Sequence, residues 1–287
     1  MRKVIIIILS IVSLALIICL VINACSNKKK DKVLSVNMAN NYSIGGGDRK
    51  ISQVLYFTRD NIYNTTSLVS QISIIDNDLR LGLKLNNIKK TNYSYKYDND
   101  KYVAYVYDLS IPKIEGDLLF DNAKMEIISD DKILTIPIGV FEVIYDSNTD
   151  NPKNINNNTL SGMCAYNPYQ TLSGITMSLE NKEFSNITID RINLGKYVDL
   201  VKTESTDVIF DSLEYNINET IIGFMEKELK LQLSYKRKLV LKESFIIIEY
   251  SDSTGSHKEI LDTFNFYDNG YKLPIDDSLI NKYEFSV

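Results

Sequence analysis

The sequence predicts a mainly β protein with two β-sandwich-like (Ig-like) halves that follow an N-terminal hydrophobic signal or anchor helix. Short apolar or alternating runs recur from Ile51 onward, separated by turns rich in Asp and Asn, which is the pattern of a sandwich or barrel. A stretch rich in Asn, without periodic apolar residues, divides these runs into two series. An uncharged apolar segment from Val4 to Ile22 precedes both series.

The apolar segment over residues 4–22 is long enough to cross a membrane. As a helix it would be about 28 Å long, close to the roughly 30 Å hydrocarbon core of a bilayer. Arg2 and Lys3 favour the cytoplasmic side for the N-terminal end, so the remaining chain is expected on the extracytoplasmic face of the membrane. Residues 1–24 are therefore predicted to be a signal peptide or a membrane anchor.

The residues that end this segment are Ile22, Asn23, Ala24 and Cys25. They resemble the lipobox of bacterial lipoproteins, although Asn23 stands where a small or apolar residue is usual. The resemblance implies cleavage before Cys25 and a diacylglycerol on its sulfur. An uncleaved anchor helix over residues 4–22 and full release of the chain are the alternatives. The expected first partner is thus the cell membrane, contacted through lipidated Cys25 or through the helix.

Composition is that of a globular protein. About 260 residues remain beyond the signal, which is enough for one large or two ordinary domains. Loss of Arg2 and Lys3 with the signal changes the formal net charge from -5 to about -7, which argues against nucleic acid as a partner. Cys19, Cys25 and Cys164 are the three cysteines, so a lipidated Cys25 leaves Cys164 unpaired and excludes a disulfide framework.

The first series of strands is expected to follow a tether. Residues 25–50 hold three consecutive lysines and Gly45 to Gly47, and are predicted to be that tether. Residues 51–146 are predicted to form the first β-sandwich-like domain. Three hairpins are expected in it, with turns at residues 76–78, 98–100 and 130–131. The aspartates of these turns are Asp76, Asp78, Asp98, Asp100, Asp130 and Asp131, and we interpret them as turn residues rather than as a cation-binding rim.

The second series is expected to follow an Asn-rich linker over residues 147–173. Residues 174–287 are predicted to form a second β-rich domain. Its clearest hairpin has a strand over residues 245–250, a turn over residues 251–256 and a return strand through Phe264. Residues 220–230 have apolar spacing that also fits a short helix.

Two motifs are candidate sites for chemistry. Asp146, Asn148 and Asp150 place oxygen ligands at alternate positions, as in the first half of a calcium loop, but the later glycine and glutamate of such a loop are missing. A polar turn is the preferred interpretation, and no metal or cofactor is predicted. Cys164 and His257 are the only thiol–imidazole pair available, and no glycines of a nucleophile elbow surround Cys164. The sequence therefore indicates no catalytic residues.

Tyrosines are the one candidate for a ligand-binding surface. The chain has 19 Tyr and no Trp, and several tyrosines lie on adjacent expected strands. By the two-residue period of a strand, Tyr93, Tyr95 and Tyr97 share one face and Tyr105 and Tyr107 share another. Exposed rings of this kind contact sugars or proteins, whereas tyrosine also simply favours strands and cross-strand pairs.

These observations favour a membrane-anchored extracytoplasmic lipoprotein that acts as a non-enzymatic binding module in a bacterial cell envelope. Its expected partner is an envelope protein or a glycan. A carboxylate-dependent envelope hydrolase is the alternative from another class, because such catalysis needs no local motif. An accessory subunit of a transporter or sensory system is the third.

Overall fold

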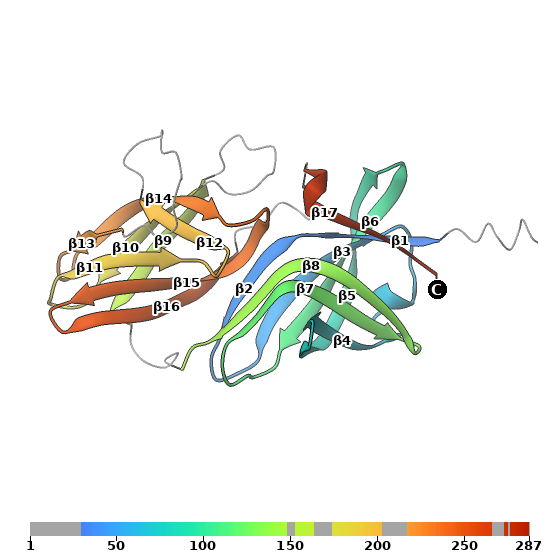
Figure 1. Ribbon diagram of the computed structural model, residues 1–287, viewed down its shortest axis with the longest axis horizontal. Helices are drawn as coiled ribbons and strands as arrows, with labels where there is room; N and C mark the ends of the chain where they lie inside the picture. Colours follow the sequence, from blue (N-terminus) through green and yellow to red (C-terminus); the bar gives the residue numbers. More distant parts are fainter. Residues whose placement is uncertain are drawn as a thin grey trace, which may run out of the picture.

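The chain is a nearly all-β protein (Figure 1). The computed structural model describes residues 30–147, 153–163, 174–202, 217–265, 273–274 and 276–286. Within these ranges the helical elements are two single 3-10 turns, η1 (Ile62–Asn64) and η2 (Asp277–Leu279). The prediction of a mainly β protein is confirmed.

The strands fall into two groups, which we call the first half and the second half. The first half contains β1 (Asp31–Val36), β2 (Met38–Ile44), β3 (Arg49–Phe57), β4 (Val69–Asp76), β5 (Leu79–Tyr97), β6 (Asp100–Ile111), β7 (Leu118–Ser129), β8 (Lys132–Tyr145) and β17 (Ile280–Phe285). The second half contains β9 (Ile155–Met163), β10 (Gly174–Asn181), β11 (Ile187–Asn193), β12 (Val198–Lys202), β13 (Glu219–Ile221), β14 (Glu226–Tyr235), β15 (Val240–Asp252) and β16 (Gly255–Asn265).

The first half consists of two layers. One layer has the order β17–β1–β3–β6–β5, and the other has the order β5–β4–β7–β8–β2. β5 belongs to both because Leu79–Leu83 pair with β4 and the residues from Lys84 pair with β6. β1 and β2 also change layer, at Asn37.

Alternation along the strands places two hydrophobic clusters on opposite faces of the β1–β3–β6 layer. Val33, Leu55 and Tyr105 point into the cluster between the two layers. Side chains an odd number of positions away along the same strands point to the opposite face. These side chains form a second cluster on the outer face, which includes Leu34, Tyr56 and Tyr102. Leu279 of η2 belongs to this second cluster, so the C-terminal segment covers a face that would otherwise be exposed.

The second half is likewise wrapped around its own hydrophobic cluster. β11, β13, β15 and β16 form one side, β9, β10 and β14 form the other, and β12 pairs with both β11 and β14. The cluster between them is dominated by Ile and Leu, including Ile175, Leu179, Ile189 and Leu231. Burial of these side chains stabilises the second half.

β2 joins the two halves into one hydrogen-bonded sheet. Its residues Met38 to Ile44 pair in parallel with β8, and its first residues pair in parallel with Val240 and Leu241 of β15. Ala39 and Val140 of the first half accordingly contribute to the hydrophobic cluster of the second half. The halves are therefore connected by backbone hydrogen bonds and by shared apolar contacts.

The expected hairpins are present. Asp98–Asn99 and Asp130–Asp131 form two-residue loops with positive φ at both positions, the geometry that matches the twist of β-strands. Asn77 adopts positive φ in the loop between β4 and β5, and the hairpin of β15 and β16 turns at residues 253–254. The backbone angles at Asp98, Asp130 and Asp131 support their interpretation as turn residues.

The structure corrects several boundaries. Residues 31–44, expected in the tether, form β1 and β2, because their apolar side chains are needed to close the first half. Residues 155–163, expected in the linker, form β9, and the 220–230 segment forms β13 and β14 rather than a helix. The chain from Asp276, expected in the second domain, returns to the first half, where β17 pairs with all of β1.

Candidate functional site

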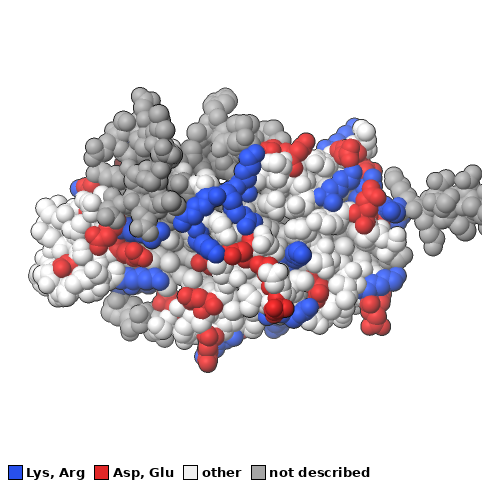
Figure 2. Space-filling view, in the orientation of Figure 1, with Lys and Arg blue, Asp and Glu red and all other residues white. Residues whose placement is uncertain are grey.

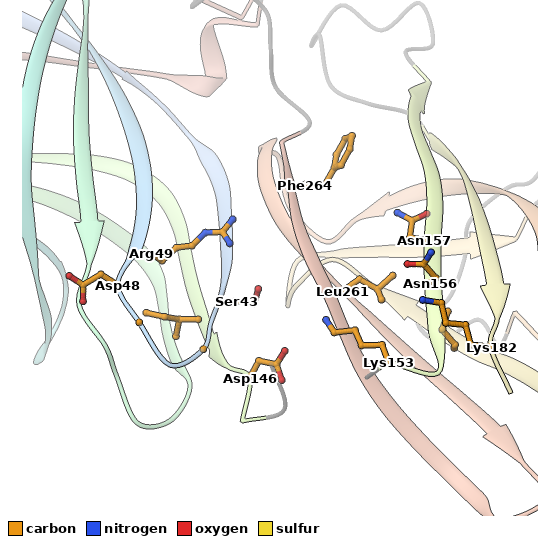
Figure 3. A pocket seen from close by; sticks show the side chains of 14 residues that line it. Ser43, Asp48, Arg49, Asp146, Lys153, Asn156, Asn157, Lys182, Leu261 and Phe264 are labelled. Carbon is orange, nitrogen blue, oxygen red and sulfur yellow. The ribbon is translucent and has the colours of Figure 1, made fainter. Parts of the chain in front are cut away.

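A polar cleft lies between the two halves and has a volume of about 650 Å³. Figure 3 shows its two walls. The first half contributes the β2–β3 turn and Asp146 at the end of β8, and the second half contributes the start of β9, Lys182 and part of β16. The volume is in the range of sites for small ligands.

The β2–β3 turn is fixed by the pairing of β2. Asp146 N–H donates to Ile44 O at 2.9 Å, which holds the exit of β8 beside this turn. Gly45 and Gly47 of the turn line the cleft, and a Cβ on Gly47 would have no neighbour within 4 Å. The glycine-rich segment expected to be a flexible tether is thus a tight turn whose backbone faces the cleft.

Charged side chains of both signs line the cleft. Arg49, Lys153 and Lys182 are its cations, and Asp48 and Asp146 are its carboxylates. Arg49 Nη2 lies 3.4 Å from Glu243 Oε1 of the second half, and Lys153 Nζ donates to the carbonyl of Ile260. Arg49 therefore connects the wall of the first half with β15 of the second half through an ion pair.

The remaining lining combines amides with apolar side chains. Asn156 and Asn157 of β9 supply carboxamides, and Ile155, Leu261 and Phe264 supply hydrocarbon surface. Figure 3 shows Phe264 and the two asparagines on the wall formed by the second half. A site that mixes amides, charges and one aromatic ring suits a ligand with many hydroxyl groups and some apolar surface.

A smaller pocket of about 460 Å³ adjoins the cleft and shares Asp146 and Lys153 with it. Glu259 organises this pocket, because its carboxylate accepts the N–H groups of Asn154 and Ile155 at 2.9 and 3.2 Å and the hydroxyl of Tyr250 at 2.8 Å. Burial and this carboxylate together raise the pKa of Tyr250. The start of β9 is thereby attached to the β15–β16 hairpin.

Contacts on the β11–β12 turn fix the halves relative to each other. Asn41 Nδ2 donates to Leu194 O at 2.5 Å, and Glu142 Oε2 accepts the N–H of Lys196 at 2.8 Å. Burial raises the pKa of Glu142. These bonds connect β2 and β8 with the second half, so the two walls of the cleft have a defined separation.

Asp121 forms a further contact between the halves. It accepts hydrogen bonds from Lys196 Nζ at 3.0 Å and from the Tyr197 hydroxyl at 2.8 Å. Burial acts to raise the pKa of Asp121, but these two hydrogen bonds and the positive charges of Lys196 and Arg237 together outweigh it, and the pKa is lowered. The Arg237 guanidinium lies 4.9 Å from the centre of the Tyr197 ring and donates to the backbone carbonyl of Asp121 at 2.8 Å.

Lys and Arg side chains are interspersed with Asp and Glu on the face of the molecule that Figure 2 shows. Near the middle of this face the Lys and Arg side chains form one short contiguous run, with Asp and Glu directly beside it.

The structure describes one of the three candidate metal ligands. Asp146 lines the cleft, whereas Asn148 and Asp150 lie outside the described residues. Among the described residues, no group of three or more His, Cys, Asp or Glu side chains could hold a metal ion.

His257 is held inside its hairpin. Its Nε2 lies 3.0 Å from Asp252 Oδ1 and 3.0 Å from the Thr254 hydroxyl, and its ring stacks on Tyr250 with centroids 5.1 Å apart. Hydrogen bonds from Thr254 and His257 lower the pKa of Asp252. Cys164, the other member of the rejected thiol–imidazole pair, lies outside the described residues, as does Cys25.

The tyrosines divide into buried and exposed rings. Tyr105 and Tyr107 are 2% and 0% exposed, so the prediction that they belong to a binding surface is wrong. Their rings fill the core between the layers, and the Tyr107 hydroxyl donates to Tyr63 O at 2.7 Å. Tyr95 and Tyr97 pack against the outer cluster, and Tyr93 is half exposed. A single exposed ring is no platform for a ligand.

Comparisons with known proteins identify no relative by sequence. No family model matches the chain, and no curated protein matches it. The C-terminal domain of the Streptococcus agalactiae AgI/II polypeptide BspA is a solved structure with 11% identity and a TM-score of 0.24, over 81% of this chain and 99% of that one. The D00–D0 domain of intimin has 11% identity and a TM-score of 0.19, over 82% of this chain and 100% of that one. With TM-scores this low, neither structure informs the function proposed below.

Within the described part of the chain, no helix has the length and apolar character needed to span a membrane. The predicted signal or anchor over residues 4–22 lies outside that part.

Proposed function

We propose that the protein is a membrane-anchored, extracytoplasmic binding protein of a bacterial envelope, made of two immunoglobulin-like sandwiches, and that it binds a hydroxyl-rich ligand such as a glycan in the cleft between them. The observation that carries this proposal is the cleft itself. It has the volume of a small-ligand site, and its polar lining comes from both halves.

The chemistry of the lining favours a glycan over a purely ionic ligand. Sugar hydroxyls donate to carboxylates such as Asp146 and accept from ammonium and amide groups such as Lys182 and Asn156. The apolar face of a sugar ring packs on side chains such as Phe264 and Leu261. An anionic ligand would encounter the carboxylate of Asp146, and a cationic ligand would encounter Lys153 and Lys182.

Binding rather than hydrolysis is proposed because the carboxylates of the cleft are not arranged as a facing pair. Asp146 lies between the two walls in Figure 3, whereas the carboxylate of Asp48 points away from the second half. A glycosidase needs two carboxyl groups on opposite sides of the scissile bond, separated by roughly 5–10 Å.

The test is calorimetric titration of the full chain with two series of oligosaccharides, one of N-acetylglucosamine and one of neutral hexoses. Gly47→Leu places a branched side chain in the cleft without a clash, so it should reduce affinity at least tenfold. Gly82→Leu is the matched control, because Gly82 also has open space around a Cβ but does not line the cleft.

A second pair of variants tests the charge of the cleft. Lys182→Gln should weaken binding several-fold, and Lys101→Gln, an exposed lysine on β6, should have no effect. Equal affinities of all four variants and the wild type would exclude the cleft as the binding site. Release of reducing ends during the same incubations would establish hydrolysis instead of binding.

A further inference from the structure

The end of the second half carries four large exposed apolar side chains on two adjacent turns. Phe184 of the β10–β11 turn is 89% exposed, and Ile222, Phe224 and Met225 of the β13–β14 turn are 61%, 55% and 55% exposed. We call these four residues the apolar tip. Exposed apolar groups of this size on one small area mark an interaction site more often than scattered single residues do.

The apolar tip is rigidly built. The rings of Phe184 and Phe224 meet edge to face with centroids 4.5 Å apart. Phe224 N–H donates to Glu183 O at 3.1 Å, which ties the two turns together through their backbones. A Cβ on Gly223 would clash with the carbonyl of Phe184, so only glycine permits this approach. Phe224 itself has φ of 57°, a costly conformation for an aromatic residue.

Many backbone polar groups of these turns are satisfied inside the tip. Met225 N–H donates to Ile222 O, and Asn181 N–H donates to Met225 O, both at 3.0 Å. The Asn181 side chain bonds the carbonyls of Ser185 and Ile221 and accepts the N–H of Glu183. These bonds pair several backbone groups of the two turns, which lowers the cost of moving the tip out of water.

We propose that the apolar tip inserts into the acyl-chain region of a lipid bilayer. The tip consists of four side chains, which are too few for a stable protein interface, because such an interface uses about 20–30 residues on each side. The charges on the two turns are nearly balanced, with Lys182 and Lys227 against Glu183, Glu219 and Glu226, and Lys227 pairs with Glu219. Insertion should therefore depend on apolar contact and proceed with uncharged, zwitterionic lipid.

We infer that the bilayer entered by the tip is a different one from the bilayer that would hold the N-terminus. In Figure 1 the tip, at the β11–β13 end of the second half, lies at the opposite end of the molecule from β1. β15 pairs with Met38 at Val240 and with Thr188 at Ser251, so it covers about 36 Å from the junction of the halves to the end that carries the tip. From the same junction, β1 extends about 20 Å in the opposite direction. Residues 26–30 reach at most about 18 Å from Cys25. This orientation rests on the anchoring proposed above and on a long axis that stands upright on the anchor, which makes the tip face an opposing membrane.

The experiment uses a single tryptophan, since the chain has none. Full-length protein with Phe184→Trp is placed in donor vesicles of phosphatidylcholine, and acceptor vesicles of phosphatidylcholine with brominated acyl chains are added. Emission should shift to shorter wavelength and be quenched at least twofold by the acceptor vesicles. Tyr93→Trp, an exposed site on the first half, is the matched reporter and should not be quenched.

Phe224→Asn, added to the Phe184→Trp protein, removes the second ring but suits the positive φ, so the double variant should fold and lose most of the quenching. Absence of quenching in the Phe184→Trp protein would overturn the proposal even if the protein remains in the donor vesicles. Quenching only when the brominated lipid is in the donor membrane would overturn the assignment to an opposing bilayer.

Two further outcomes separate the tip from its alternatives. A blue shift that depends on protein concentration without acceptor lipid would indicate a second copy of the chain and overturn the bilayer as the occupant. Quenching of protein that fails to enter donor vesicles would support the tip and contradict the anchor.

Discussion

Asn41 of β2 and Gly195 of the β11–β12 turn are in direct contact across the junction of the two halves. A Cβ on Gly195 would lie 2.5 Å from Nδ2 of Asn41 and 2.8 Å from Oε2 of Glu142. Gly195 also has φ of 103°, which L side chains rarely adopt. The junction therefore depends on glycine at this position for two independent reasons.

Replacement of Gly195 by Ala should lower the free energy of unfolding by about 2–4 kcal/mol, because backbone strain and crowding against Asn41 add to each other. Gly255→Ala is the control, since Gly255 has φ of 141° but open space around its Cβ and should lose only the strain contribution. Urea denaturation of both variants checks the difference. Equal losses would show that the contact with Asn41 is not tight.

Lys242 should make stability rise with pH. It is buried at the junction, where its ammonium donates to the carbonyl of Ser52, and burial lowers its pKa to about 8. Between about pH 8 and pH 10 the unfolded chain binds a proton at this side chain that the folded chain has lost, so folding becomes more favourable as pH increases. Above this range, Tyr105 and Tyr250 lower the stability as pH increases, because their raised pKa values keep them protonated longer in the folded chain than in the unfolded chain.

Lys242→Met should abolish that rise and stabilise the protein at pH 7 by up to about 3 kcal/mol, the free energy that corresponds to the pKa shift. Thermal unfolding between pH 7 and pH 10 measures both effects. Lys101→Met, at an exposed site, serves as the control and should retain the pH dependence. A rise that persists in Lys242→Met would assign it to another group.

Phe285 should stabilise the first half although it is almost the last residue of the chain. Its ring packs edge to face on Phe57 and Tyr63, with centroids 6.2 and 5.4 Å away. Phe285→Ala should cost about 2–3 kcal/mol, somewhat less than a fully buried ring. Hydrogen exchange should accelerate in β1 and β3 and remain unchanged in β11 and β15. Ser286→Ala, at an exposed neighbouring position, should change neither region.

Cys25→Ala should abolish lipidation in a Gram-positive host. The wild-type protein is expected to lose residues 1–24, gain the mass of a lipid and partition with the membrane, as the lipobox resemblance implies. Intact mass and membrane partition of both proteins make the comparison. If both retain the complete N-terminus and remain in the membrane, the segment over residues 4–22 is an anchor helix.

Local features of the fold were predictable from the sequence, and features set by distant contacts were not. The hairpin turns at Asp98–Asn99 and Asp130–Asp131 were predictable because neighbouring residues determine them. β1 and β2 were missed because Asn40, Asn41 and Ser35 are polar yet buried, which removes the alternation that marks a strand. The return of β17 to β1 joins residues about 250 positions apart, and no sequence pattern encodes such pairing.

The cleft was missed for a similar reason. Its lining comes from five separate segments, and the Gly45–Gly47 turn is indistinguishable from a linker without the β2–β8 pairing that positions it. Tyr105 and Tyr107 show the opposite error, because the two-residue period gives their common face but not whether that face is covered. The exposed phenylalanines at positions 184 and 224 gave no signal, since each is isolated in the sequence.

The parallel pairing of β2 and the return of β17 together mean that the second half is an insertion within the first, connected to it by two stretches of chain. One connection leaves β8 after Asp146, and the other precedes η2. A protease that cuts either connection once would leave the second half covalently attached through the other. Limited digestion would therefore separate the halves only after two cuts, and a singly nicked protein should keep its cleft.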